Sequence, residues 1–166
     1  MGVGIEIGCK CNKKEYMLGV GMMFPSVYKD TVQNAKDGKF GKTIQTLMQQ
    51  NEYAVMDVGN TLYYCDKCGH IESNDPLDIY IAKDVESFKK KEYGIKTVEE
   101  WGEVPYWSVP SEEDDEYNDF IKIYTHTHKC PTCKIEMKSV TPEYLENTPC
   151  PKCGEKHEIL DNMLWD

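Results

Sequence analysis

The chain has 166 residues, enough for one ordinary domain or two small ones, and it carries a formal net charge of -10 at pH 7. All 19 of its Lys+Arg residues are lysines. An acidic protein is repelled by phosphate backbones, and without arginine it lacks the forked donor that reads guanine. We therefore do not expect sequence-specific binding of nucleic acid, and we expect any macromolecular partner to be a protein with a basic surface.

The start of the chain and its apolar runs predict neither secretion nor membrane attachment. Residues 1–6 lack the basic start and the apolar core of a secretory signal. The longest apolar run, residues 17–24, is too short to span a bilayer. We expect a cytoplasmic protein, where reducing conditions favour metal binding by cysteines over disulfides.

The first predicted element is a hairpin of strands at residues 3–9 and 15–20, with two cysteines at its tip. Cys9 and Cys11 are two positions apart, so in extended backbone both side chains point to one face. This C-x-C pair is interpreted as half of a metal site. The alternative is that one of the two is a ligand and the other a buried free cysteine.

Helical composition follows at residues 27–36 and 43–50, and the glycine-containing stretch 37–41 should break it into two helices. Residues 53–57 and 61–65 then predict a second hairpin, turning at Gly59 and Asn60. Its second strand leads into Cys65 and Cys68, a C-x-x-C pair. Residues 77–82 predict a further strand.

The stretch 84–118 is expected to be an acidic connector with short helices. Asp84 should cap one helix, and the capping box from Thr97 to Glu100 should open another that ends at Gly102. Residues 103–118 contain two prolines, the aromatic residues Tyr106 and Trp107, and an acidic run at 112–116. We expect the acidic run to be solvated and the aromatic side chains to dock on a domain.

Residues 119–128 predict a strand that leads into two further C-x-x-C pairs, Cys130 with Cys133 and Cys150 with Cys153. Sixteen residues separate these pairs, and each tight turn directs both sulfurs towards one cation. Gly154 suits the left-handed backbone that such a turn needs at its end. Residues 130–154 resemble the zinc ribbon superfamily, and the sequence C-P-x-C-G at 150–154 is similar to the cysteine knuckle of rubredoxins.

All eight cysteines are candidate ligands of two structural zinc ions, and two groupings were weighed. The nested grouping places the first four around one ion and the last four around the other, because closing the short loop between the C-terminal pairs costs little entropy. A cross-braced grouping would interleave the pairs. The first set comprises Cys9, Cys11, Cys65 and Cys68, and the second comprises Cys130, Cys133, Cys150 and Cys153.

These elements predict an α+β fold of antiparallel hairpins that form two modules resembling zinc ribbons, with an inserted helical segment. The expected domains are residues 1–83 with the first cysteine set, the connector 84–118, and a C-terminal ribbon at 119–166. No set of catalytic residues is visible in the sequence.

A shell of four cysteines leaves no open coordination position, so we expect a non-enzymatic zinc protein that serves as an interaction or adaptor module. One alternative is electron transfer by iron in the C-terminal site, as the resemblance to rubredoxin implies. The other is thiol-disulfide chemistry at Cys130 and Cys133. That chemistry needs a helix beginning at the motif, whereas residues 135–140 alternate like a strand.

Overall fold

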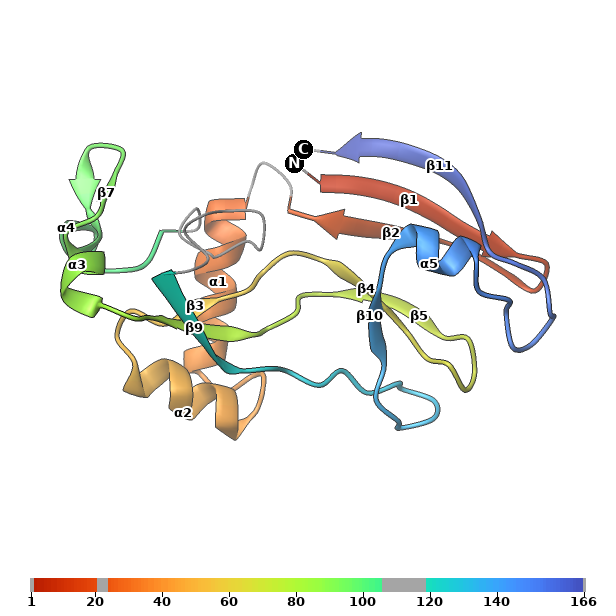
Figure 1. Cartoon of the computed structure of the whole chain (residues 1–166), viewed down its shortest axis with the longest axis horizontal. Coiled ribbons are helices and arrows are strands. Elements are labelled where there is room, and N and C mark those ends of the chain that lie inside the picture. Colours follow the sequence, from red (N-terminus) through yellow and green to blue (C-terminus); the bar gives the residue numbers. More distant parts are fainter. Residues whose placement is uncertain (1, 21–23, 106–118, 166) are drawn as a thin grey trace. The chain divides into compact units, whose positions relative to one another are not determined.

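A computed structural model describes residues 2–20, 24–105 and 119–165 of the chain, and for residues 24 and 161–165 it describes the backbone alone (Figure 1). Its helices are α1 (Phe24–Lys36), α2 (Lys42–Gln50), α3 (Val85–Lys89), α4 (Val98–Trp101) and α5 (Pro142–Glu146). Its strands are β1 (Gly2–Cys9), β2 (Asn12–Gly19), β3 (Val55–Met56), β4 (Thr61–Tyr64), β5 (Ile71–Asn74), β6 (Ile79–Ala82), β7 (Glu92–Tyr93), β8 (Lys96–Thr97), β9 (Phe120–Tyr124), β10 (Lys138–Val140) and β11 (Glu158–Trp165). Helices and small antiparallel sheets together confirm the predicted α+β class.

The chain divides into two compact units, each assembled from separate stretches of sequence. Unit 1 comprises residues 1–22, 59–76 and 126–166, and unit 2 comprises residues 23–58 and 77–125. These boundaries differ from the expected domains at 1–83, 84–118 and 119–166. The difference arises because several strands pair with partners far away in the sequence.

Unit 1 contains two three-stranded sheets of the same design, ordered β11-β1-β2 and β10-β4-β5 (Figure 1). In each sheet, two strands form a hairpin that carries one cysteine pair near its tip: β1–β2 in one sheet and β4–β5 in the other. The third strand, β11 or β10, follows a different cysteine pair and lies antiparallel to the first strand of the hairpin. Each sheet therefore joins two cysteine pairs that are distant in the sequence.

The core of unit 1 is small and includes buried cysteine side chains. One buried cluster lies between the two sheets and α5: Ile5, Ile7, Tyr16, Leu62, Tyr64, Ile71 and Leu145. The other consists of Tyr63, Cys65, Cys130 and Met137. Cysteine side chains thus take the place of part of an apolar core.

Unit 2 combines the sheet β3-β6-β9 and the short hairpin β7-β8 with helices α1 to α4. Two clusters of nine buried residues each make its core, one centred on Ile44, Met48, Met56 and Ile79, the other on Phe88 and Val98. The predicted break between α1 and α2 is confirmed: Gly38 and Gly41 adopt positive φ angles of 84° and 100°. The predicted caps of α3 and α4 at Asp84 and Thr97 are also present.

The predicted hairpin of residues 53–57 and 61–65 is wrong. Strand β3 pairs with β6 in unit 2, whereas β4 pairs with β5 and β10 in unit 1. Gly59 does not adopt the positive φ that a tight hairpin turn would require there. Residues 58–60 instead connect the units. Likewise, β9 was expected to belong to the C-terminal ribbon, but it pairs with β6 in unit 2.

Part of the predicted connector lies outside the described residues, namely Tyr106, Trp107 and the acidic run at 112–116. Among the residues that the structure does describe, no helix is both long enough and apolar enough to cross a membrane.

Candidate metal centres

The eight cysteines lie in two clusters of four, and within each cluster the sulfurs are all within 4.8 Å of one another. We call the first cluster the outer centre because its cysteine pairs bracket the other cluster in the sequence; the second is the inner centre. The outer centre consists of Cys9, Cys11, Cys150 and Cys153, and the inner centre of Cys65, Cys68, Cys130 and Cys133.

This grouping is neither the nested nor the cross-braced one. The structure does not bring Cys9 and Cys11 together with Cys65 and Cys68, nor does it gather the four C-terminal cysteines into one site. Strand pairing explains the outcome, because β1 pairs with β11 and β4 with β10. The entropy of loop closure opposes the observed grouping only weakly. Bringing together cysteines 139 positions apart, instead of seventeen, costs roughly 2 kcal/mol more in conformational entropy.

The outer centre combines a hairpin tip with a knuckle. Cys9 faces Asn12 in the last pair of the β1–β2 ladder, which places Cys11 in the turn. In the knuckle, the Gly154 N–H donates to the Cys150 carbonyl over 2.8 Å. The Cys11 sulfur lies 3.4 Å from that of Cys9 and 3.6 Å from that of Cys150. Both members of the C-x-C pair therefore face the knuckle, as the interpretation as half a site requires.

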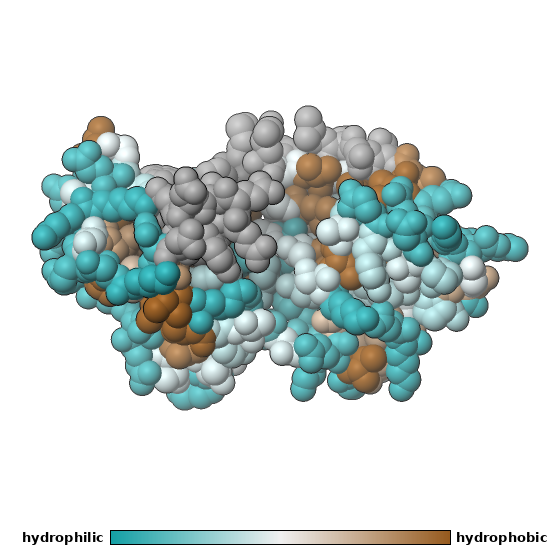
Figure 2. Space-filling model, in the orientation of Figure 1, coloured by the Kyte–Doolittle hydropathy of each residue, from teal (hydrophilic) through white to brown (hydrophobic). Residues whose placement is uncertain are grey.

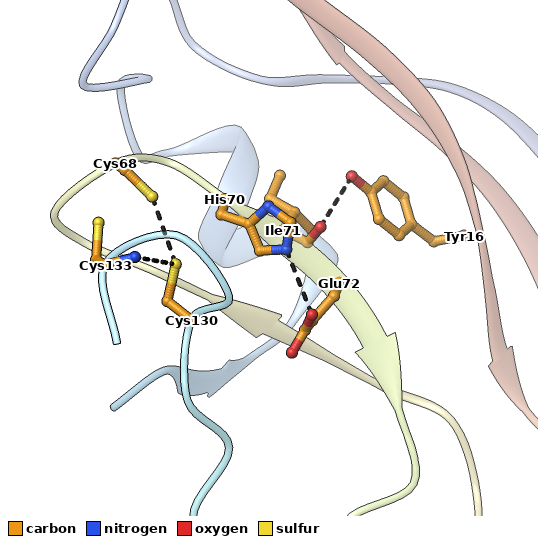
Figure 3. Close-up of polar contacts among 7 residues, drawn as sticks. All are labelled: Tyr16, Cys68, His70, Ile71, Glu72, Cys130 and Cys133. Atoms are coloured by element: carbon orange, nitrogen blue, oxygen red, sulfur yellow. Dashed lines mark hydrogen bonds and ion pairs between the residues drawn. The ribbon is translucent and has the colours of Figure 1, made fainter. Parts of the chain in front are cut away.

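The inner centre is made of two knuckles with the same hydrogen bonds. The Gly69 N–H donates to the Cys65 carbonyl over 2.8 Å, and the Lys134 N–H donates to the Cys130 carbonyl over 2.9 Å. Figure 3 shows Cys68, Cys130 and Cys133 converging, with 3.6 Å between the sulfurs of Cys68 and Cys130. The Cys133 N–H also points at the Cys130 sulfur, 3.4 Å away.

The residue after the second cysteine of each knuckle has left-handed backbone. Gly69 has φ 69°, Gly154 has φ 74°, and Lys134 has φ 62°. Lys134 therefore adopts the same conformation as the two glycines. The knuckle hydrogen bonds thus hold a residue with a side chain in a conformation that favours glycine.

The sulfur positions fit a tetrahedral metal ion. With a zinc–sulfur bond near 2.3 Å, the edge of a tetrahedron of sulfurs is about 3.8 Å. The closest sulfur pairs, at 3.4–3.6 Å, come near this length. Four sulfur donors suit zinc and iron alike, and they leave no free coordination position at which water or substrate could be activated.

The pKa values of the thiols show how each cluster is arranged for a cation. Burial by itself raises the pKa of Cys130, but N–H groups of Cys133 and Thr132 outweigh it and lower the pKa to about 6. Cys150 is similar: burial opposes ionisation, and N–H groups of Lys152 and Cys153 bring its pKa to about 6. Backbone dipoles at both knuckles therefore favour the thiolate that a metal requires.

The pKa values of Cys11 and Cys68 are shifted in the opposite direction. Hydrogen bonds with Cys9, Cys150 and Cys153 raise the pKa of Cys11 to about 12. Burial is the main cause that raises the pKa of Cys68 to about 12, with hydrogen bonds to the other inner thiols adding to it. A divalent cation would displace these protons.

Histidines lie beside the two centres but belong to neither cluster. His128 is buried against the Tyr63 ring, with ring centroids 3.9 Å apart. His70 lies 3.3 Å from Glu72, while the Tyr16 hydroxyl donates to the Ile71 carbonyl over 3.4 Å (Figure 3). His128 accordingly supports the inner centre by packing, in keeping with the expectation that cysteines fill the ligand positions.

Thiol-disulfide chemistry at Cys130 and Cys133 requires a helix that begins at the motif, and the structure has none there. After Cys133 the chain forms a bridge between Lys129 and Glu136 and continues into β10, so no helix begins at the Cys130–Cys133 motif. The strand predicted at residues 135–140 is present over its second half, as β10.

Comparison with known proteins adds no family assignment: no family model, curated protein or solved structure matches the chain.

Proposed function

We propose that the chain is a non-enzymatic zinc protein in which two structural ions, one in each four-cysteine centre, fix the sheets of unit 1 and thereby hold an interaction surface. The observation that carries this proposal is the convergence of eight free cysteines into two closed clusters. Both clusters join strands that are distant in the sequence, so metal binding would stabilise the pairing of those strands. A closed shell favours a structural role over a catalytic one.

Metal analysis of the chain, purified under reducing conditions without added metal, tests the zinc assignment. Two zinc ions per chain and a colourless solution are expected. Replacement of zinc by cobalt should give the visible bands of tetrahedral thiolate coordination, and a variant with Cys11→Ala and Cys153→Ala should bind one ion. A chain that carries no metal, yet keeps its fold under reducing conditions, would contradict the proposal.

For the partner, we propose a protein with a basic surface. The net charge of -10 without arginine supports this class, because such a surface attracts cations over distances set by salt screening. Apolar residues form small, separate patches on the face shown in Figure 2, within a largely hydrophilic surface. Polar and charged contacts should therefore dominate binding.

The partner proposal is tested by capture on the zinc-loaded chain at low and at high salt. Bound proteins should be basic, and raising the salt to about 0.5 M should release them, because screening removes attraction between exposed charges. Glu143 and Glu146 are exposed on α5 and make no ion pair within the described part of the chain, so replacing both with lysine tests charge directly. Capture that is insensitive to salt, or that recovers only nucleic acid, would overturn it.

A second candidate is electron transfer by iron, which we propose for the inner centre. The expected C-terminal iron site does not exist as a cluster, because Cys130 and Cys133 lie in one centre and Cys150 and Cys153 in the other. The inner centre is the one with two C-x-x-C knuckles, both with left-handed backbone at the end, as in the resemblance to rubredoxin. A red protein with one iron per chain and a reversible one-electron couple would favour this candidate.

A further inference from the structure

The two centres differ in how far their sulfurs are exposed. In the outer centre Cys11 is exposed, Cys9 and Cys153 are half-buried and Cys150 is buried. In the inner centre Cys65 and Cys130 are buried, and Cys68 and Cys133 are half-buried. The difference follows from local structure, because Cys11 lies in the two-residue turn after β1, whereas the inner cysteines lie in knuckles whose side chains pack with Tyr63 and Met137. A reagent in water therefore meets the outer centre at Cys11.

The sulfurs also differ in their contacts. The Cys133 N–H points at the Cys130 sulfur, 3.4 Å away. The Cys11 sulfur instead lies 3.4 Å from the Cys9 sulfur and 3.6 Å from the Cys150 sulfur. A second sulfur is therefore close enough to react with Cys11 once Cys11 is oxidised.

Space for a small reagent lies next to this sulfur. A cavity of about 110 Å³ is lined by Cys9, Cys11 and Cys150 together with Lys14, Lys152 and His70. Since one water needs about 10–15 Å³ of such volume, the cavity has room for a hydroperoxide. Its lysines place positive charge near the thiolates.

We propose that Cys11 is a modification site for hydroperoxides, and that its oxidation releases the metal of the outer centre while the inner centre keeps its own. The Cys11 thiolate attacks one oxygen of hydrogen peroxide, and the O–O bond breaks to give a sulfenic acid and hydroxide. The Cys9 thiolate, 3.4 Å away, then attacks the Cys11 sulfur, forming a disulfide and expelling a second hydroxide. Two thiolates lose two electrons, the peroxide gains them, and the divalent ion is freed.

This inference rests on the proposed zinc centres, and its test first measures the zinc content so that the two can fail separately. The full chain with two zinc ions is exposed to hydrogen peroxide, and free zinc is followed with a chromophoric chelator. We expect one ion to be released at least about tenfold faster than the other, which corresponds to a barrier difference of about 1.4 kcal/mol. Mass mapping after partial reaction should place the first modification on the peptide that contains Cys9 and Cys11.

Paired histidine variants separate reactivity from metal binding. Cys11→His keeps a nitrogen ligand for zinc but removes the reactive sulfur, so the fast release should slow about tenfold or more. Lys10→His introduces the same side chain at an exposed position of the same turn and should leave the fast release unchanged. The mapping of the unaltered chain needs neither variant to fold.

Equal release of both ions, or first modification at an inner cysteine, would overturn the inference even with two zinc ions bound. A chain that binds no zinc before oxidation would instead overturn the proposed function.

Discussion

The two units of this chain are stabilised by different interactions. Among the side chains that the structure describes, unit 2 has two apolar clusters of nine buried residues each, whereas the clusters of unit 1 have seven and four, and two of those four are cysteines. Small cores rarely provide enough burial to offset the conformational entropy of folding. From this difference we expect unit 1 to depend on metal and unit 2 to fold without it.

Metal removal should have the largest effect and should be confined to unit 1. With excess chelator and reductant, the β11-β1-β2 and β10-β4-β5 sheets should lose their protection against hydrogen exchange, since a structural zinc site contributes roughly 10 kcal/mol to folding. Strands β6 and β9 of unit 2 should keep their protection. Mass spectrometry of exchange in peptides from the two units measures both. Equal loss in both units would break the comparison.

A substitution that leaves a cavity in the core of unit 2 should destabilise that unit and leave the metal centres of unit 1 intact. Ile44 is fully buried in unit 2, so Ile44→Ala should cost about 2–5 kcal/mol of stability in that unit. The zinc content should remain at two ions, because both centres lie in unit 1. Exchange and metal analysis on one sample check this. Leu145→Ala is the matched change in the core of unit 1; it should weaken zinc retention, and a loss of zinc in Ile44→Ala would contradict the distinction.

Some of the features behind these two predictions can be recognised from local sequence, and others depend on long-range strand pairing. The four cysteine pairs were predictable as candidate half-sites, because the spacing within each pair is a local property. The caps at Asp84 and Thr97 were predictable for the same reason. The grouping was not, because it depends on β1 meeting β11 and β4 meeting β10, and alternation of apolar residues does not identify a strand's partner.

Loop length is a weak guide to which cysteine pairs share a site, because the differences in closure entropy are small. Closure entropy grows only with the logarithm of loop length, so long-range strand pairing outweighs the advantage of neighbouring cysteine pairs. Similarly, Gly59 and Asn60 resemble a hairpin turn, although the residues around them enter different sheets. Tertiary pairing decides such cases.

The knuckle glycines allow a finer comparison of the two centres. An alanine at Gly69 would bring its Cβ to 2.9 Å from Pro151 Cδ of the outer knuckle, in addition to the cost of positive φ. At Gly154 no atom lies within 4 Å of the added Cβ. We therefore expect Gly154→Ala to cost roughly 1–2 kcal/mol and Gly69→Ala clearly more.

Because Gly69 lies against the outer knuckle, Gly69→Ala should also speed the loss of zinc from both centres, whereas Gly154→Ala should affect the outer one alone. Thermal unfolding and competition with a chelator measure the two effects. Equal losses of stability in the two variants would mean that the contact between Gly69 and Pro151 does not constrain the knuckles.

The smallest expected effect is a gain. Lys134 is the one knuckle-terminal residue of the three that has a side chain, and its φ of 62° is unfavourable for it. Lys134→Gly should stabilise unit 1 by roughly 0.5–1 kcal/mol, since relief of left-handed strain exceeds the added freedom of the unfolded chain. Thermal unfolding of the zinc-loaded protein checks the sign. Lys129→Gly, a change in the same loop, should not stabilise.

The chain order of the two centres also bears on how the protein is made. The inner cysteines are 62 positions apart across the pair Cys68 and Cys130, and the outer ones 139 positions apart across Cys11 and Cys150. At a synthesis rate of about 5–20 residues per second, the β1–β2 hairpin waits on the order of ten seconds for its partner knuckle to leave the ribosome. During that interval the hairpin and its two thiols have no strand β11 beside them, so the nascent chain passes through a stage in which its first-made cysteines are open to cellular metal carriers and chaperones.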